Sequence, residues 1–288
     1  MTQKLNVTSR TVSSYAWADT YREVAVKAQF VRETLENRGI ILRNGSALFR
    51  LLKQAHLLSE AWDRQSEADP TVLCEAAHVN RLADAVKALQ LESGIQEALQ
   101  RMASSVMQSD DRTMSQGKDA LWEIALLADF RKAKLTSRAA EPDIIVDCGF
   151  GDYPVACKKI WSEKGVANQV RSASRQLRPF QNGGIIALNL DDLVPAGRVL
   201  IQEFGRDALQ FLNFFNKDFV DRHRYVLQRA IFEMKCDGFI VSTTTPAVLI
   251  QELPPFNLIT QNLFWNIKEA TSDSLSRFNS FAQRSSER

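Results

Sequence analysis

The sequence lacks the features that mark several large classes of protein. Its four cysteines form no C-x-x-C pair, so we expect neither a disulfide framework nor a zinc ribbon. No apolar run approaches the roughly 18 residues of a membrane-spanning helix. The N-terminus also lacks the apolar segment of a signal peptide. These absences predict a cytoplasmic protein with no membrane partner.

The net charge and a search for common catalytic motifs identify no nucleic-acid, ATP or acyl-transfer function. The 36 Lys+Arg and 34 Asp+Glu residues leave a net charge of +2, which gives no global indication of a nucleic-acid partner. No G-x-x-x-x-G-K-[ST] or G-x-S-x-G motif is present, so neither ATP use nor a serine nucleophile is supported. Cys74 and His78 are four residues apart, but structural zinc takes four ligands. The 45 % hydrophobic content is that of an ordinary globular protein.

The patterning predicts two parts, a helical domain over residues 1–114 and an α/β domain over 115–288. Apolar residues at helical spacing predict helices over 19–37, 45–62 and about 71–107, with Gly94 as a candidate point of interruption in the last. A polar stretch without periodicity, 103–117, favours a boundary there. Long helices with apolar stripes often associate, so we expect these to form a homodimer or to bind a partner protein.

The pattern changes after residue 117. A helix of about four turns is followed by LTSRAA, PDIIVDC and YPVACKKI, then by a second helix and IIALNL. The apolar and β-branched runs predict strands, and the last two are far enough apart for a parallel crossover. Helices and strands follow as a C-terminal extension, and the Ser/Arg-rich end from about residue 280 is predicted to be disordered.

Three charged residues lie in apolar surroundings within this region. Glu123 is the only charge in ALWEIALLA, where a buried carboxylate is costly unless it is compensated. A partner arginine or a position at the edge of the apolar face is the alternative to a site carboxylate. Asp143 opens the run IIV, and a strand-capping role is its alternative. Lys158 and Lys159 end YPVACKK on opposite strand faces, so only one is a candidate for an interior site.

A basic segment follows directly. Between residues 158 and 178 six basic residues accompany the single acid Glu163. The arginines fall at i, i+4 and i+7 of one predicted helix, a spacing that suits phosphate contacts but is equally typical of a solvated face. The candidate nucleic-acid-binding residues are Lys159, Lys164, Arg171, Arg175 and Arg178. Gln169 and Gln176 share a neighbouring stripe and could reach into a site.

The order of these features over residues 118–193 resembles the PD-(D/E)xK nuclease superfamily, whose restriction-endonuclease-like core is αβββαβ with a mixed sheet. The resemblance implies that Asp143 is the motif aspartate and a metal ligand, and that Lys158 is the motif lysine near the attacking water. It implies that Glu123 and the Cys157 carbonyl complete the metal shell, and that Gln169 or Gln176 supports the site. The expected cofactor is Mg²⁺ or Mn²⁺, which prefers such oxygen ligands.

The resemblance therefore implies a metal-dependent endonuclease acting on DNA rather than RNA, in defence or repair. The sequence departs from the pattern at Ala156, where the superfamily places its second acid. Glu123 could substitute for that acid, or Asp147 or Asp152 could reach in from the hairpin. The remaining alternative is an inactive nuclease fold that binds nucleic acid or a protein.

Overall fold

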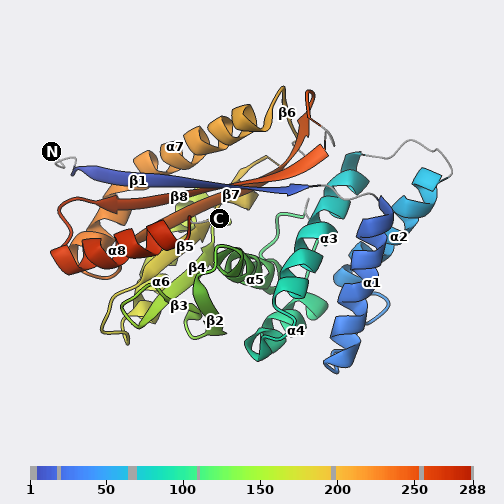
Figure 1. Cartoon of the computed structure of the whole chain (residues 1–288), viewed down its shortest axis with the longest axis horizontal. Helices are drawn as coiled ribbons and strands as arrows, with labels where there is room; N and C mark the ends of the chain where they lie inside the picture. The colour runs from blue at the N-terminus through green and yellow to red at the C-terminus, as the bar shows by residue number, and fades with distance from the viewer. Residues whose placement is uncertain are drawn as a thin grey trace.

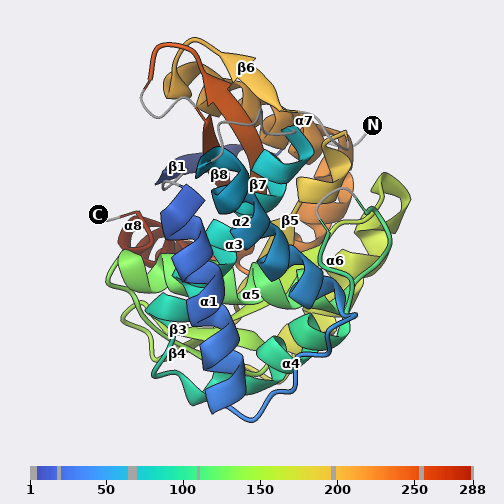
Figure 2. The ribbon, with the colours of Figure 1, turned by 90° about the vertical axis from the view of Figure 1, so that its right-hand side faces the viewer.

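A computed structural model describes residues 5–17, 21–63, 70–108, 111–195, 199–252 and 256–286. The chain is an α/β protein in which α1–α5 precede an eight-stranded mixed sheet interleaved with helices, as predicted. Helices α1–α4 lie together at one end of the sheet, and α7 and α8 lie along it (Figure 1). Viewed from that end, α1 and α2 face the reader and α5 lies behind them (Figure 2).

The helices and strands have the following bounds. The first half contains β1 (Val7–Trp17), α1 (Tyr21–Asn37), α2 (Ala47–Asp63), α3 (Pro70–Ala88), α4 (Gln96–Ser104), α5 (Gln116–Lys132), β2 (Thr136–Ala140) and β3 (Asp143–Asp147). The second half contains β4 (Asp152–Lys159), α6 (Val166–Leu177), β5 (Ile185–Asn189), β6 (Leu200–Gln202), α7 (Gly205–Phe232), β7 (Gly238–Leu249), β8 (Phe256–Ile267) and α8 (Ser272–Arg284). Short 3₁₀ turns cover Ser93–Ile95, Glu163–Gly165 and Asp191–Leu193.

The sheet has the strand order β1-β8-β7-β5-β4-β3-β2, and β6 pairs with β7. Strands β2, β3 and β4 form an antiparallel meander, whereas β4, β5 and β7 are parallel. The α5-β2-β3-β4-α6-β5 succession confirms the predicted αβββαβ order and the crossover between parallel strands.

The N-terminal region is not wholly helical, which corrects the expectation for residues 1–114. Strand β1 pairs antiparallel with β8 from Val7↔Ile267 to Trp17↔Asn257. Its sequence alternates Val, Thr and Ser, residue types that suit a strand, but a pairing partner some 250 residues away cannot be read from a local pattern. The helix expected over 71–107 is interrupted at Gly94, the point of interruption that the sequence suggested, and is divided into α3, a 3₁₀ turn over Ser93–Ile95 and α4.

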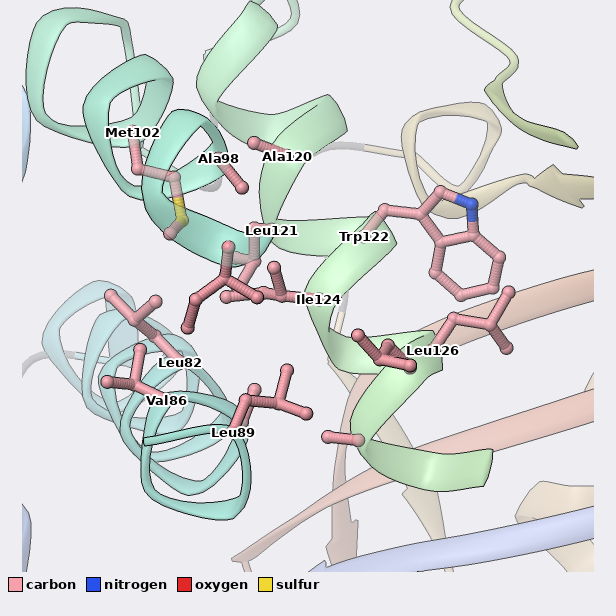
Figure 3. Close-up of a cluster of buried hydrophobic side chains, with 14 of the residues drawn as sticks. Leu82, Val86, Leu89, Ala98, Met102, Ala120, Leu121, Trp122, Ile124 and Leu126 are labelled. Atoms are coloured by element: carbon pink, nitrogen blue, oxygen red, sulfur yellow. The ribbon is translucent and has the colours of Figure 1, made fainter. Parts of the chain in front are cut away.

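Helix α5 links the N-terminal helices to the sheet. Eleven of its seventeen residues are buried, as expected for a helix that is apolar on all sides. Leu121 and Ile124 point towards α3 and α4, while Trp122 and Leu126 extend from the other side of the helix (Figure 3). One hydrophobic cluster therefore runs from α1 through α5 to the sheet, across the predicted boundary at residue 114.

Helix α6 covers the opposite face of the sheet. Its buried residues Val166, Val170, Ala173 and Leu177 repeat at helical spacing and pack with Ala156 and Ile186. This packing places the basic residues of α6 away from the sheet. None of the described helices combines the length and apolar character needed to cross a membrane.

Candidate active site

Asp143 lies where β3 and β4 diverge. The β3–β4 pairing ends at Ile144↔Val155, and the Asp143 side chain continues it by accepting a hydrogen bond at Oδ2 from the Cys157 N–H, at 2.7 Å. In an extended strand the N–H and C=O of one residue point to the same side. The Cys157 carbonyl is therefore directed to the same gap between the strands.

Strand alternation brings Asp143 and Lys158 to one face of the sheet. Ile144 and Val155 pack in the cluster on the α5 side, whereas Ala156 packs on the α6 side. Asp143 and Lys158 alternate onto the α6 side together with Ala156. Lys158 is half-buried and lowers the pKa of Asp143, so the motif aspartate and lysine predicted from sequence interact electrostatically.

Glu123 approaches from α5 and forms an ion pair with Arg101 of α4. Arg101 donates to both carboxylate oxygens, with 3.2 Å between Nη1 and Oε1. The alternative of a partner arginine is thus met, but Glu123 also faces the same cavity as Asp143. The structure therefore shows the Arg101 partner and places Glu123 at the cavity, and a role for it as a site carboxylate stays a prediction.

A cavity of about 280 Å³ brings the candidate residues together. Its lining comes from α4, α5, the β2–β3 hairpin and α6, and includes Arg101, Glu123, Asp143 and Gln176. The Gln176 Oε1 atom is buried without a hydrogen-bond partner among the described residues. Such an atom is unfavourable unless a ligand or water satisfies it. Gln169 does not line this cavity, so the structure selects Gln176 of the two glutamines.

The cavity carries an unbalanced negative charge. The pKa of Asp143 is raised from 3.8 to about 7, mainly by burial and next by the nearby Glu123 carboxylate. Lys158, the Cys157 N–H and Arg101 act in the opposite direction without compensating fully. A carboxylate pair in this state is stabilised by a proton or by a bound cation.

Asp119 was not identified from the sequence, although it lies four residues before Glu123 on the same helix. Its Oδ1 is buried without a partner among the described residues. Its pKa is raised to about 6, mainly by burial and also by the Glu123 carboxylate, while Lys159, Arg101 and Lys158 act in the opposite direction. The i, i+4 spacing from Glu123 was the available signal.

Lys159 does not lie at a surface for nucleic acid. It alternates to the α5 side, where it is 8 % exposed and bonds to Asn189 at 2.8 Å and to Asp192 at 2.6 Å. Arg112, from the segment before α5, also contacts Asp192, at 2.9 Å. A lysine held in this way has no charge available for phosphate, so this placement removes Lys159 from the expected interface.

The other basic candidates are exposed. Arg171, Arg175 and Arg178 line a groove between α6 and α7, on the other side of α6 from Gln176. Lys164 is exposed in the turn before α6 and does not line this groove.

Asp147 and Asp152 lie beside the β3–β4 turn, at the opposite end of the hairpin from Asp143. Asp152 is exposed and pairs with Arg138 at 2.6 Å, and Asp147 accepts the Gly149 N–H in the turn. Neither replaces the acid missing at Ala156. Among the candidates raised from the sequence, only Glu123 supplies a second carboxylate to the cavity.

The donor set fits a hard divalent cation. Asp143, Glu123, the Gln176 amide and the Cys157 carbonyl provide only oxygen ligands, which suit Mg²⁺ or Mn²⁺. In the described parts of the chain, no three acidic, His or Cys side chains are grouped closely enough to hold a metal. Backbone, amide and water oxygens would therefore complete the shell. Comparisons with family models, with curated proteins and with solved structures found no match for this chain.

Proposed function

We propose that this protein is a divalent-metal-dependent phosphodiesterase that hydrolyses nucleic acid, with DNA as the favoured substrate. The observation that carries the proposal is the Asp143 carboxylate at the divergence of β3 and β4. It shares a cavity with Glu123 and the unsatisfied Gln176 oxygen, and Lys158 lies close enough to affect its charge.

Each residue has a role consistent with hydrolysis. Asp143, the Cys157 carbonyl and Gln176 would hold Mg²⁺ or Mn²⁺, and Glu123 would join them by releasing one of its contacts with Arg101. When bound, the ion would polarise a phosphate oxygen and a water molecule. Lys158 would stabilise the negative charge that develops as the water oxygen bonds to phosphorus and the P–O bond of the leaving group breaks. The attacking water would release one proton to solvent and the leaving oxygen would take one up from solvent, so that one water molecule is added across the broken P–O bond.

Cleavage of plasmid and of labelled oligonucleotides in Mg²⁺ or Mn²⁺ tests the proposal. We expect Asp143→Ala, Lys158→Ala and Glu123→Gln each to lower cleavage by at least about 100-fold, the lower range for an acid–base or electrostatic group. Asp152→Ala is the matched control, because this aspartate lies on the same hairpin outside the cavity. Wild-type protein that cuts neither DNA nor RNA with either metal would refute the proposal.

A second candidate is a nuclease fold that binds nucleic acid without cleaving it. Two observations favour it, the alanine at position 156 and the engagement of both Glu123 oxygens by Arg101. Salt-dependent DNA binding by a wild type that never cleaves, unchanged in Asp143→Ala, would support this candidate.

A further inference from the structure

A basic groove lies between α6 and α7. Its volume is about 890 Å³, and it runs along α6 and the C-terminal part of α7 to the start of α8. Six cationic side chains line it, against the two carboxylates Glu233 and Asp237: Arg171, Arg175, Arg178, Arg229, Lys235 and Arg277.

The carboxylates of the groove are already occupied. Glu233 pairs with Arg229 and Lys235, and Asp237 forms a two-bond contact with Arg277 at 2.7 and 2.9 Å. The α6 arginines form no ion pair with any described residue, and Arg171 has only a 3.4 Å hydrogen bond to Asn168. Three of the four uncompensated positive charges of the groove therefore come from α6, and the fourth comes from Arg229 and Lys235, which share the single carboxylate of Glu233.

The groove also offers surface on which a base can stack. Tyr225 lines it, is 55 % exposed and is hydrogen-bonded to Arg229. Phe180 and the apolar Val170 and Val226 line the same recess. Cationic grooves with an accessible aromatic ring are typical of single-strand binding, because an unpaired base exposes its ring face whereas a duplex hides it.

We propose that this groove binds a single strand of nucleic acid, with its phosphates on Arg175 and Arg178 and a base on Tyr225. The inference goes beyond the proposed function, because the groove and the Asp143 cavity share no lining residue among those described. Gln176 faces the cavity, whereas its neighbours Arg175 and Leu177 line the groove, so α6 separates the two.

Binding of a fluorescent single-stranded oligonucleotide, measured by anisotropy in EDTA, tests the proposal without any cleavage. We expect R175Q/R178Q to weaken binding roughly tenfold or more at low salt and to reduce the slope of log K against log salt by about 1.4, since each lost single-strand phosphate contact removes about 0.7. The control R50Q/K53Q removes the same charge from exposed positions of α2, and we expect it to bind like the wild type.

Two substitutions of Tyr225 measure how much base stacking contributes to the binding affinity. Tyr225→Phe keeps the ring, so we expect near-wild-type affinity, whereas Tyr225→Leu should lose roughly tenfold. Circular dichroism and thermal unfolding establish that each variant is folded. Equal losses in both Tyr225 variants would contradict a stacked base.

Three results would overturn the inference. They are wild-type affinity in R175Q/R178Q, tighter binding of a duplex than of the single strand, and full displacement of the oligonucleotide by an equal concentration of ATP. The last result would assign the groove to free nucleotides. The binding assay contains no metal, so its result is independent of the cleavage assay. A wild type that never cleaves in Mg²⁺ or Mn²⁺, together with weaker binding in R175Q/R178Q, would refute the proposed function and support single-strand binding by the groove.

Discussion

The raised pKa of Asp143 predicts a pH-dependent cost to stability that a metal ion should remove. The pKa is about 7 in the folded protein and near 3.8 when the side chain is solvated. A carboxyl group with a raised folded pKa stabilises the protein fully below its unfolded pKa, and this contribution is lost as pH rises through 7. The wild type should therefore lose stability between about pH 4 and pH 8 relative to Asp143→Asn, which does not titrate.

The magnitude follows from the size of the shift. Three pKa units correspond to at most about 4 kcal/mol. Because Asp143 is only partly enclosed, solvent relaxation reduces this figure to roughly 2–3 kcal/mol. Urea unfolding of both proteins in EDTA, at several pH values across this interval, measures the difference directly. Millimolar Mg²⁺ or Mn²⁺ should stabilise the wild type more at about pH 8 than at about pH 5, since protons compete with the ion for the carboxylate.

Asp152→Asn provides the control. Arg138 lowers the pKa of this exposed carboxyl, so its contribution to stability changes with pH in the opposite direction to that of Asp143. Its contribution is present above the unfolded pKa and is lost as pH falls. Parallel pH profiles for the wild type and Asp143→Asn would show that Asp143 is not a destabilised carboxylate. If Mg²⁺ and Mn²⁺ do not stabilise the wild type against urea, Asp143 does not bind a divalent cation.

Three further changes test other parts of the structure. Lys159→Met should lower the free energy of unfolding in urea by about 3–5 kcal/mol, because it leaves the Asp192 carboxylate buried with one cation fewer. The control Lys164→Met, at an exposed position, should have no measurable effect. Arg101→Gln frees Glu123, so we expect tighter Mn²⁺ binding by calorimetry, and unchanged binding would show that the ion pair does not limit access to the site. Tyr153→Phe removes a buried hydrogen bond to Asp237 at 2.9 Å and should destabilise the protein by about 1–3 kcal/mol, whereas an unchanged unfolding midpoint would contradict this assignment.

Local patterns predicted the core of the fold well. The α5-to-β5 succession could be derived because β-branched runs, glycine turns and an apolar helix follow one another without long gaps. The same reasoning missed β1, whose partner β8 lies at the other end of the chain. The Ser/Arg-rich C-terminus, expected to be disordered from residue 280, is helical as far as Arg284, because Phe278 and Phe281 are buried.

The sequence singled out Glu123, Asp143 and Lys158, but it did not single out Asp119 or Arg101. Glu123 and Asp143 stand out because each is a charge in apolar sequence. Nothing near Arg101 marks it as the partner of Glu123, since the contact depends on the packing of α4 against α5. Lys158 and Lys159 are adjacent and chemically identical, so alternation showed only that they lie on opposite strand faces, and the choice of Lys158 came from the resemblance.

The N-terminal helices contribute a carboxylate to the cavity that Asp143 lines. Glu97 and Glu141 line this cavity as well as Glu123 on α5, and Glu123 is the carboxylate held by Arg101 on α4. The position of that carboxylate therefore depends on α4 and α5 staying packed together. Any ligand or partner that shifts α4 against α5 would change the charge facing Asp143, so the N-terminal helices contribute directly to this cavity.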